Sequence, residues 1–209
     1  MSDPSSIRVL CVDDHPLIRE GLAAVIRSQS DMQLVAEASS GQEAIQRFRE
    51  FHPDVTLMDL RLPDMSGIDA LMAIRAESFD ARVIILTTFE GDVEVQRALE
   101  AGARSYMLKS MPPRDLVDTI RRVHAGKKRI PAEVAARLAE HIGGESLSDR
   151  EVEVLKHVAD GNKNWEIAER LFISEETVKV HIKHIMEKLG ASDRTEAVSI
   201  AVRRGIIQL

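Results

Sequence analysis

The strongest constraint on the fold of this chain is a short apolar run, Val55–Asp59, that ends on a carboxylate. Apolar runs of this length are typical of strands buried on both faces of a parallel sheet. Asp59 would then lie at the carboxyl end of its strand, the edge where open α/β sheets place their ligands. An acid that leaves water there loses hydration free energy unless a cation compensates its charge.

Three other strand-like runs also end in polar groups: Ile7–Val12 before Asp13 and Asp14, Val83–Leu86 before Thr87 and Thr88, and Ser105–Leu108 before Lys109. Crowded carboxylates repel one another and have raised pKa values. A hard divalent cation relieves this repulsion, and oxygen ligands with room for water suit Mg²⁺. Acids, a hydroxyl and an ammonium at one edge indicate a phosphoryl-transfer site with Asp59 as the nucleophile.

Strands and helices alternate through the first part of the chain. Further strands are predicted over Gln33–Ala38 and Arg82–Thr87, and helices over a segment opened by His15-Pro16, then Gly41–Glu50, Ile68–Ala76, Val93–Ala101 and Pro113–Ala125. Strict alternation with short connections predicts a doubly wound parallel sheet. The flavodoxin-like strand order 2-1-3-4-5 would bring Asp13, Asp14 and Asp59 together at the switch point.

From Leu147 onward the pattern predicts helices alone. The spacings Ser148 to Glu151 and Asp193 to Glu196 are those of capping boxes, which predict the first and fourth helices. Asn164 is expected to cap a second, short helix. After a tight turn at residues 172–174, Ser174 is expected to cap the third helix, Glu175–Leu189. Two helices joined by so tight a turn predict a helix-turn-helix.

The third helix has two distinct faces. Its apolar face, expected to be buried, consists of Val178, Ile182, Ile185 and Leu189. Its opposite face consists of Lys179, Val180, Lys183 and Glu187. Lysines suit guanine O6 and N7, and valine suits a thymine methyl, so this face is suited to the major groove of DNA.

The domains are expected at residues 1–126 and 145–209, joined by a linker over 127–144 that contains a helix over 133–142. The acidic excess lies in residues 1–124, with a net charge of −6, whereas residues 145–209 carry −2. DNA binding would therefore depend on a local basic face. Lys127 and the two basic residues after it are either a solvated linker or an attraction for DNA.

The single cysteine, Cys11, excludes an internal disulfide and is expected to be a buried, inert thiol. The sequence has neither an apolar run long enough for a membrane span nor a secretory signal at its N-terminus. These observations predict a cytoplasmic protein.

The acid pair Asp13-Asp14, Asp59, Thr87 and Lys109, in this order on successive strands, resemble the receiver pattern of two-component response regulators. The C-terminal part, through Leu147–Leu155 and Thr177–Lys183, resembles the LuxR-type DNA-binding domain. The whole chain therefore resembles the NarL/LuxR (FixJ) family of response regulators.

The resemblance implies that a histidine kinase or a small phosphodonor phosphorylates Asp59. Asp14, Asp59 and the backbone carbonyl of Arg61 would hold Mg²⁺, with Asp13 acting mostly through water. Lys109 and Thr87 would bind phosphoryl oxygens next to Thr88. Tyr106 would be either a filling residue of the sheet or the aromatic that turns inward when Thr87 engages the phosphoryl group.

The resemblance also implies how DNA is bound. Lys179, Val180 and Lys183 would read bases, and the DNA backbone would be contacted by Lys163, Asn164, Thr177, Lys188 and Arg194. The implied partners are a sensor histidine kinase, a double-stranded operator, RNA polymerase and a second copy of the chain. Trp165 is as consistent with capping or packing as with a DNA contact, and His15 with a surface position as with partner docking.

Two other functions remain as alternatives. A phosphohydrolase that forms an aspartyl phosphate needs a general acid two residues after the nucleophile, where this chain has Arg61, which does not donate a proton at neutral pH. Slow self-dephosphorylation is therefore expected, but not turnover of external esters. The other alternative is a DNA-binding regulator whose receiver is a dimerisation scaffold without phosphorylation.

Overall fold

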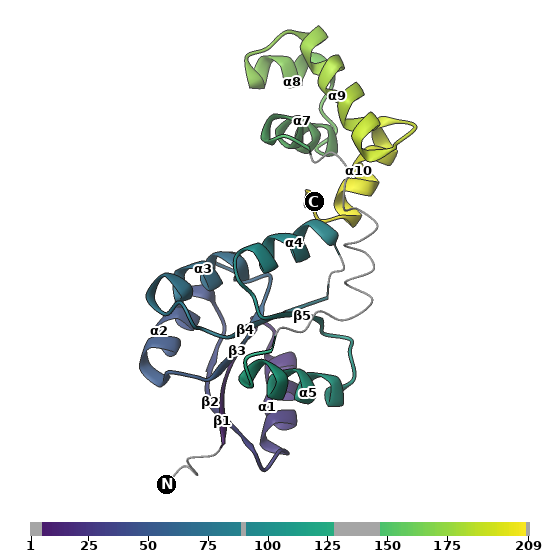
Figure 1. Ribbon diagram of the computed structural model, residues 1–209. Coiled ribbons are helices and arrows are strands. Elements are labelled where there is room, and N and C mark those ends of the chain that lie inside the picture. Colours follow the sequence, from purple (N-terminus) through teal and green to yellow (C-terminus); the bar gives the residue numbers. More distant parts are fainter. Residues whose placement is uncertain (1–5, 89–90, 128–146, 208–209) are drawn as a thin grey trace. The chain divides into compact units, whose positions relative to one another are not determined.

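The computed structural model describes residues 6–88, 91–127 and 147–207. These residues form two compact units, of which the first contains a sheet and the second only helices (Figure 1). The predicted linker helix over 133–142 lies outside the described residues.

The first unit is built on a five-stranded parallel sheet in the order β2-β1-β3-β4-β5, which confirms the predicted order. Its strands are β1 (Ile7–Val12), β2 (Met32–Ala38), β3 (Val55–Asp59), β4 (Val83–Thr87) and β5 (Ser105–Leu108). Every residue of β3 and β4 is buried, as expected for apolar strands covered on both faces.

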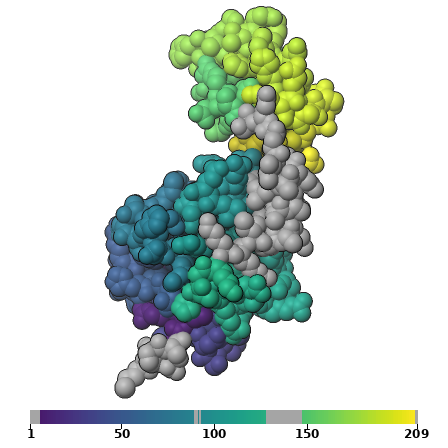
Figure 2. Space-filling model, in the orientation of Figure 1, coloured from purple at the N-terminus to yellow at the C-terminus, as the bar shows by residue number. Residues whose placement is uncertain are grey.

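Helices cover both faces of this sheet. They are α1 (Pro16–Arg27), α2 (Gly41–Phe51), α3 (Gly67–Glu77), α4 (Asp92–Glu100) and α5 (Pro113–His124). The helices α1 and α5 lie on one face, and α2, α3 and α4 on the other (Figure 1). In the space-filling view, α5 forms part of the outer surface of this unit (Figure 2). The ends of these helices lie within one or two residues of the predicted ones.

The core between the sheet and the α1/α5 layer uses alternate strand residues, because successive side chains of a strand point to opposite faces. It contains Val9 and Cys11 of β1, Leu57 of β3 and Ile120 of α5. Cys11 is fully buried, and this burial raises the pKa of its thiol far above its usual range, with smaller contributions from nearby acids. The thiol is therefore protonated and inert, as predicted.

The second unit is the predicted helical part. Its helices are α7 (Asp149–Ala159), α8 (Asn164–Leu171), α9 (Glu175–Leu189) and α10 (Arg194–Arg203). Val154, Ile167, Val178 and Ala201, one from each helix, lie in a single apolar core. Since these short helices bury their apolar faces against one another, the fold of this unit depends on all four.

Two of the predicted caps are confirmed. Ser148 accepts a hydrogen bond from the amide of Glu151, and the Glu151 carboxylate accepts one from the amide of Ser148, so the capping box is complete. Ser174 accepts from the amide of Thr177 at 3.0 Å and caps α9. Both caps satisfy amides that lack partners within the helix.

The other two caps differ from the prediction. Asn164 is the first residue of α8 rather than its cap, and the amide that precedes it, that of Lys163, donates to the Glu166 carboxylate at 2.6 Å. Asp193 does cap α10, but Glu196 accepts from Ser192 instead of Asp193. Ser192 offers Glu196 two donors, its amide and its hydroxyl, which explains this choice.

The turn between α8 and α9 depends on an unusual backbone conformation. Phe172 has φ 54°, in the left-handed region, and its side chain is 95% exposed. This conformation ends α8, because it turns the chain out of the helix within one residue. The predicted tight turn is therefore present.

Candidate phosphoryl site and nucleic-acid interface

The register of the sheet brings the predicted site residues to one edge. Val12 pairs with Met58, so Asp13 and Asp59 follow at the same level on neighbouring strands. Asp59 pairs with Leu86, the residue before Thr87, on the next strand. Lys109 follows the last residue of β5, and its amide donates to the Thr87 carbonyl at 2.7 Å. Four strands therefore deliver their terminal side chains to the same place.

Lys109 lies between two buried carboxylates. Its Nζ is 2.6 Å from Oδ2 of Asp13 and 2.8 Å from Oδ2 of Asp59. The Asp13 side chain is fully buried, and those of Asp59 and Lys109 are nearly so. One ammonium thus compensates part of the charge of two acids, which leaves the cluster with net negative charge.

The local environment changes the pKa of both partners. Burial raises the pKa of Asp59, and the Asp13 charge adds to this, so together they outweigh the lowering effect of Lys109. Burial alone would lower the pKa of Lys109, but hydrogen bonds and charges from Asp13 and Asp59 raise it instead. Because burial is the main cause of the raised pKa of Asp59, a cation bound beside this carboxylate would favour its ionised form.

The more exposed side of the cluster is formed by Asp14 and His15. His15 Nδ1 lies 2.6 Å from Oδ1 of Asp14, and the His15 amide donates to Oδ1 of Asp13 at 2.9 Å. The sequence did not indicate that His15 would contact both acids.

The cluster fits a metal ion. One ligand atom from each of Asp13, Asp14, His15 and Asp59 lies within 4.8 Å of the others. Three clustered carboxylates, of which that of Asp14 is exposed to water, fit a hard divalent cation. Among the described residues, this cluster is therefore the candidate metal centre.

The remaining predicted residues surround Asp59. Thr87 is buried at the end of β4, whereas Thr88 is exposed. Tyr106 is fully buried in β5, where it pairs with Ile85 of β4. The backbone amide of Arg61 donates to the Asp59 carboxylate. The metal-binding role of the Arg61 carbonyl stays a prediction.

Sequence reasoning missed two residues that shape the loop after Asp59. The Asp64 carboxylate accepts from the amides of Gly41 and Gln42 at 2.8 and 2.9 Å, which ties this loop to the start of α2. A Cβ at Gly67 would lie 2.0 Å from the Asp59 carbonyl oxygen. Gly67 therefore allows the chain to return close to Asp59; its position at the start of a predicted helix was the available signal.

The exposed face of α9 carries the residues predicted to read bases. Val180 is 46% exposed, and the side chains of Lys179 and Lys183 are exposed. Each lysine forms an ion pair on its own helix, Lys179 with Glu176 at 3.2 Å and Lys183 with Glu187 at 3.6 Å. Exposed pairs of this kind are weak, so both lysines are available to a stronger anion.

The residues predicted to contact the DNA backbone differ in their surroundings. Lys188 forms an ion pair with the buried Glu151 at 2.8 Å, and Arg194 donates to the Asn162 carbonyl at 3.0 Å. Thr177 bonds Ser174, and Asn164 is partly buried. Lys163 is exposed and therefore the most accessible cation of this group.

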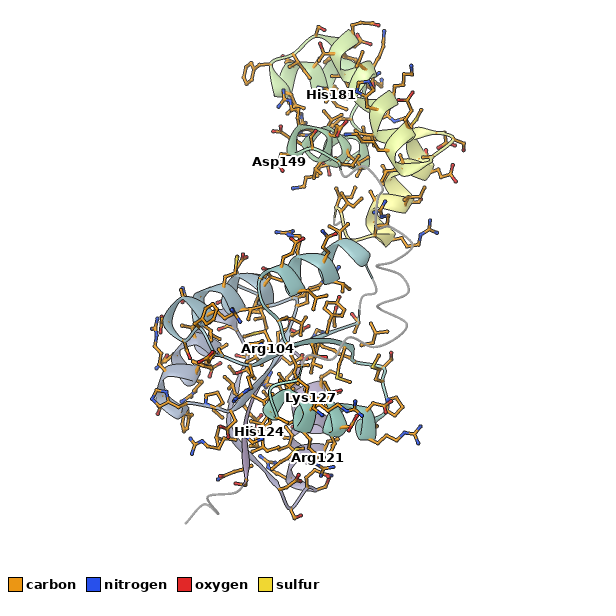
Figure 3. All side chains as sticks on the ribbon, in the orientation of Figure 1. Arg104, Arg121, His124, Lys127, Asp149 and His181 are labelled. Carbon is orange, nitrogen blue, oxygen red and sulfur yellow. The ribbon has the colours of Figure 1, made fainter. Side chains whose placement is uncertain are left out.

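The first unit has further basic residues at and just beyond the end of α5, where Figure 3 labels Arg121, His124 and Lys127. Arg121 forms a bidentate ion pair with Asp31, with donor–acceptor distances of 2.7 and 2.9 Å. Lys127 is exposed, as expected for the first residue of a solvated linker.

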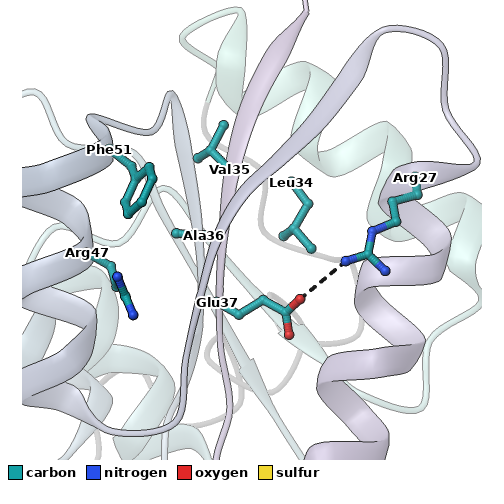
Figure 4. A pocket seen from close by; sticks show the side chains of 7 residues that line it. All are labelled: Arg27, Leu34, Val35, Ala36, Glu37, Arg47 and Phe51. Atoms are coloured by element: carbon teal, nitrogen blue, oxygen red, sulfur yellow. Dashed lines mark hydrogen bonds and ion pairs between the residues drawn. The ribbon is translucent and has the colours of Figure 1, made fainter.

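A pocket of about 330 Å³ lies along the edge strand β2, between Arg27, Glu37, Arg47 and Phe51 (Figure 4). Arg27 forms an ion pair with Glu37 across it at 3.5 Å. The pocket is lined by none of the predicted site residues, and its two arginines face Glu37 and Phe51 rather than an unsatisfied group.

None of the helices in the described ranges is both long and apolar enough to cross a membrane.

An acid cluster with a lysine at the carboxyl edge of a doubly wound sheet, followed by a helix-turn-helix, defines a receiver coupled to a DNA-binding domain. Family models agree: residues 9–121 match the response regulator receiver domain, and residues 145–201 match the bacterial regulatory proteins of the luxR family. The chain belongs to the two-component response regulators of the NarL/LuxR family, and it is a transcription regulator rather than a typical enzyme.

Known relatives match nearly the whole chain. The transcriptional regulatory protein LiaR of Bacillus subtilis (strain 168) is 42% identical, over 96% of this chain and 99% of its own. The crystal structure of the response regulator ChrA has 37% identity and a TM-score of 0.59, covering 97% of this chain and 100% of that one. A structure of an RcsB–DNA complex has 26% identity and a TM-score of 0.72, covering 95% and 98%.

Proposed function

We propose that this regulator receives a phosphoryl group on Asp59 from a sensor histidine kinase, or from a small phosphodonor, and then binds operator DNA as a homodimer. The observation that carries the proposal is the position of Lys109 Nζ between Asp13 and Asp59. A buried acid whose pKa is raised and whose neighbours are a lysine and further acids has the features of a phosphoryl acceptor.

We assign residues 1–126 to the receiver, 127–144 to a linker and 145–209 to the DNA-binding domain. The family matches over 9–121 and 145–201 support these boundaries. We propose a cytoplasmic location, because the proposed kinase and operator DNA are both met there.

The proposed reaction is an in-line transfer. A carboxylate oxygen of Asp59 forms a bond to phosphorus while the bond from phosphorus to the kinase imidazole nitrogen breaks, and the imidazole keeps the electron pair. Lys109 then pairs with one oxygen of the transferred group, and the Thr87 hydroxyl donates to another. Because the ammonium already contacts Asp59, it needs little movement to do so.

Asp13, Asp14, Asp59 and the Arg61 carbonyl would hold Mg²⁺, which when bound neutralises the charge of the phosphoryl oxygens. The chain would take a phosphoryl group from small donors by itself and lose it slowly. Arg61, two residues after Asp59, is a permanent cation and cannot take a proton from a water that attacks the aspartyl phosphate, which accounts for the slow loss.

The proposed switch lies at the ends of β4 and β5. Thr87 would move towards the phosphoryl oxygen, with Thr88 following it, and Tyr106 would occupy the space behind Thr87. The full burial of Tyr106 and its pairing with β4 support this role, because the side chain is already directed into the unit.

For DNA, we propose that Lys179, Val180 and Lys183 contact base edges in the major groove. Lys163 is the favoured backbone contact because it is exposed. The others are Asn164, which is partly buried, and Thr177, Lys188 and Arg194, which have partners within the unit. The RcsB structures, which are described as bound to DNA, support this assignment. RNA polymerase is the further partner that transcription control implies.

The test is phosphorylation of Asp59→Asn by acetyl phosphate with Mg²⁺, followed by intact-mass measurement. The wild-type chain is expected to gain one phosphoryl group and the variant none. Asp80→Asn changes an exposed acid outside the site and serves as the matched control, which should label like the wild type. Full labelling of Asp59→Asn would remove Asp59 from this role.

A further inference from the structure

We infer that the indole of Trp165 packs on the sugar-phosphate backbone of DNA and is an additional, sequence-independent DNA contact. The inference rests on the proposed DNA binding and adds to it a residue that makes an apolar contact. It begins from an unusual feature, a tryptophan that the fold leaves in water.

Trp165 is 54% exposed. It occupies the second position of α8, whose buried residues are Ile167, Ala168 and Leu171. Within the described part of this unit, Trp165 belongs neither to the apolar core nor to the partly buried residues packed on it. Its packing contributes little to the fold, although an indole has among the largest apolar surfaces of any side chain.

The surroundings of Trp165 are suited to an anion. Lys163, two residues earlier, is exposed. Arg194, at the start of α10, donates to the Asn162 carbonyl at 3.0 Å, so its guanidinium lies beside the segment that leads into α8. Two cations, one just before α8 and one at the start of α10, therefore lie at the end of α8 that carries Trp165, which favours a polyanion over an apolar or basic partner.

The helix-turn-helix geometry determines which polyanion this end would meet. When the second helix of the motif lies in the major groove, the first helix crosses the DNA backbone. Here the exposed face of α9 carries Lys179, Val180 and Lys183, so α8 is the helix that crosses the backbone. Trp165, in its first turn, would then meet deoxyribose and phosphate.

The chemistry of the indole fits such a position. Its ring covers the apolar surface of a sugar, and its Nε1–H donates a hydrogen bond to a phosphate oxygen. Both contacts are independent of base identity, so Trp165 would add affinity without adding sequence preference.

Trp165 is the only tryptophan of the chain, so its emission reports on this contact directly. We would titrate the full chain with a short duplex of arbitrary sequence at low salt, where the attraction between the basic side chains and the phosphates is screened least. The emission is expected to change on binding and to return when salt is added. Binding without any change in emission would overturn the inference.

Affinity measurements separate the contact from a structural role. Trp165→Ala should weaken binding of the arbitrary duplex about tenfold. Trp165→Phe should weaken it less, because phenylalanine still offers an aromatic ring to the sugar and loses only the N–H donor. Neither should change the dependence of affinity on salt, since indole is neutral. Lys163→Ala should instead reduce the salt slope by about one.

Phe172→Ala is the matched control, because it removes a more exposed aromatic side chain from the turn of the same motif. It should leave the affinity unchanged. Equal losses for Trp165→Ala and Phe172→Ala would overturn the inference, as would unchanged affinity of Trp165→Ala. If the inference about Trp165 fails but Lys183→Ala still removes sequence preference, the proposed DNA-binding function stands. A wild-type chain that binds no DNA would contradict both the inference and the proposed function.

Discussion

Lys109 determines the electrostatic balance of the candidate phosphoryl site. Its ammonium lies within 2.8 Å of both Asp13 and Asp59, and all three groups are buried. The amides of His15 and Arg61 also donate to these acids, but Lys109 is the cation that both share. The site is thus stable without being neutral, and this is the condition in which a metal ion is strongly attracted.

Lys109→Met should lower the free energy of unfolding of the receiver by about 3 kcal/mol at neutral pH, because it leaves two buried acids without their cation. Mg²⁺ should restore part of this loss by supplying positive charge at the same place. Urea unfolding followed by circular dichroism, with and without Mg²⁺, measures both effects.

The control for this prediction is Lys127→Met, which removes an exposed lysine of the same unit and should change stability little. A Lys109→Met variant as stable as this control would show that the ammonium does not stabilise the acids.

At the scale of residues, the sequence predicted those side chains that end strands. Asp13, Asp59, Thr87 and Lys109 each follow an apolar run, and parallel strands end at a common edge. Asp64 was missed because its partners, Gly41 and Gln42, lie more than twenty residues away in the chain and belong to the start of α2. A turn acid that bonds distant amides looks the same in sequence as one that bonds its neighbours.

At the scale of elements, the start of α7 is joined to the end of α9 through one carboxylate. Glu151 completes the capping box with Ser148 and also accepts from Lys188 Nζ at 2.8 Å. The helix α9, which carries the residues predicted to read bases and is here called the recognition helix, is therefore fixed at its C-terminal end by the cap of α7. This explains why Lys188, which was expected from the sequence to contact the DNA backbone, is only partly accessible.

Glu151→Gln should destabilise the helical unit by about 2 kcal/mol at neutral pH, since hydrogen bonds to a charged group contribute about this much. Burial alone would raise the pKa of Glu151, but the bonds from Lys188 and Ser148 lower it below its usual value. This stabilisation is therefore complete above the unfolded pKa of about 4.3 and is lost as pH falls through the folded pKa.

Amide hydrogen exchange in α7 and α9, measured for the wild type and Glu151→Gln at several pH values, tests this. The difference between the two should shrink as the pH falls below about 4. Glu153→Gln, on the exposed face of α7, is the control. A difference that grows in acid would contradict the sign of the pKa shift.

Helix positions were predicted better than the caps that begin them. Ser148 and Ser174 were correct because each is followed at the right spacing by an amide it can reach. Glu196 has the spacing of a capping box but accepts from Ser192 rather than from the Asp193 amide. Spacing alone does not show which of these two neighbouring donors the carboxylate binds. The left-handed Phe172 carries no sequence signal, because glycine or asparagine is the usual residue there.

At the scale of the whole molecule, the receiver and the DNA-binding unit were both predictable, because the alternation of apolar strand runs with helices gives way to helices alone at one place in the chain. The order of the sheet followed from the alternation of its elements. The relation between the units was not predictable, since a linker sequence restricts only the distance between its ends.

If phosphorylation controls assembly, acetyl phosphate with Mg²⁺ should convert the wild-type chain to a species of twice the mass, measured by light scattering after size exclusion. Removal of Mg²⁺ with EDTA before the donor is added should prevent the change. Asp59→Asn should stay a single chain under both conditions. Equal masses for treated and untreated wild type would favour the receiver as a scaffold that does not respond to phosphorylation.

The buried thiol of Cys11 has a practical consequence. It is the only cysteine of the chain, it lies in β1 between β2 and β3, and its burial raises the pKa of the thiol. Maleimide dyes should therefore not react with Cys11 in the native protein. A new cysteine placed on each unit would then be labelled selectively, without replacing Cys11. Two such dyes would report the distance between receiver and recognition helix in a single molecule before and after phosphorylation.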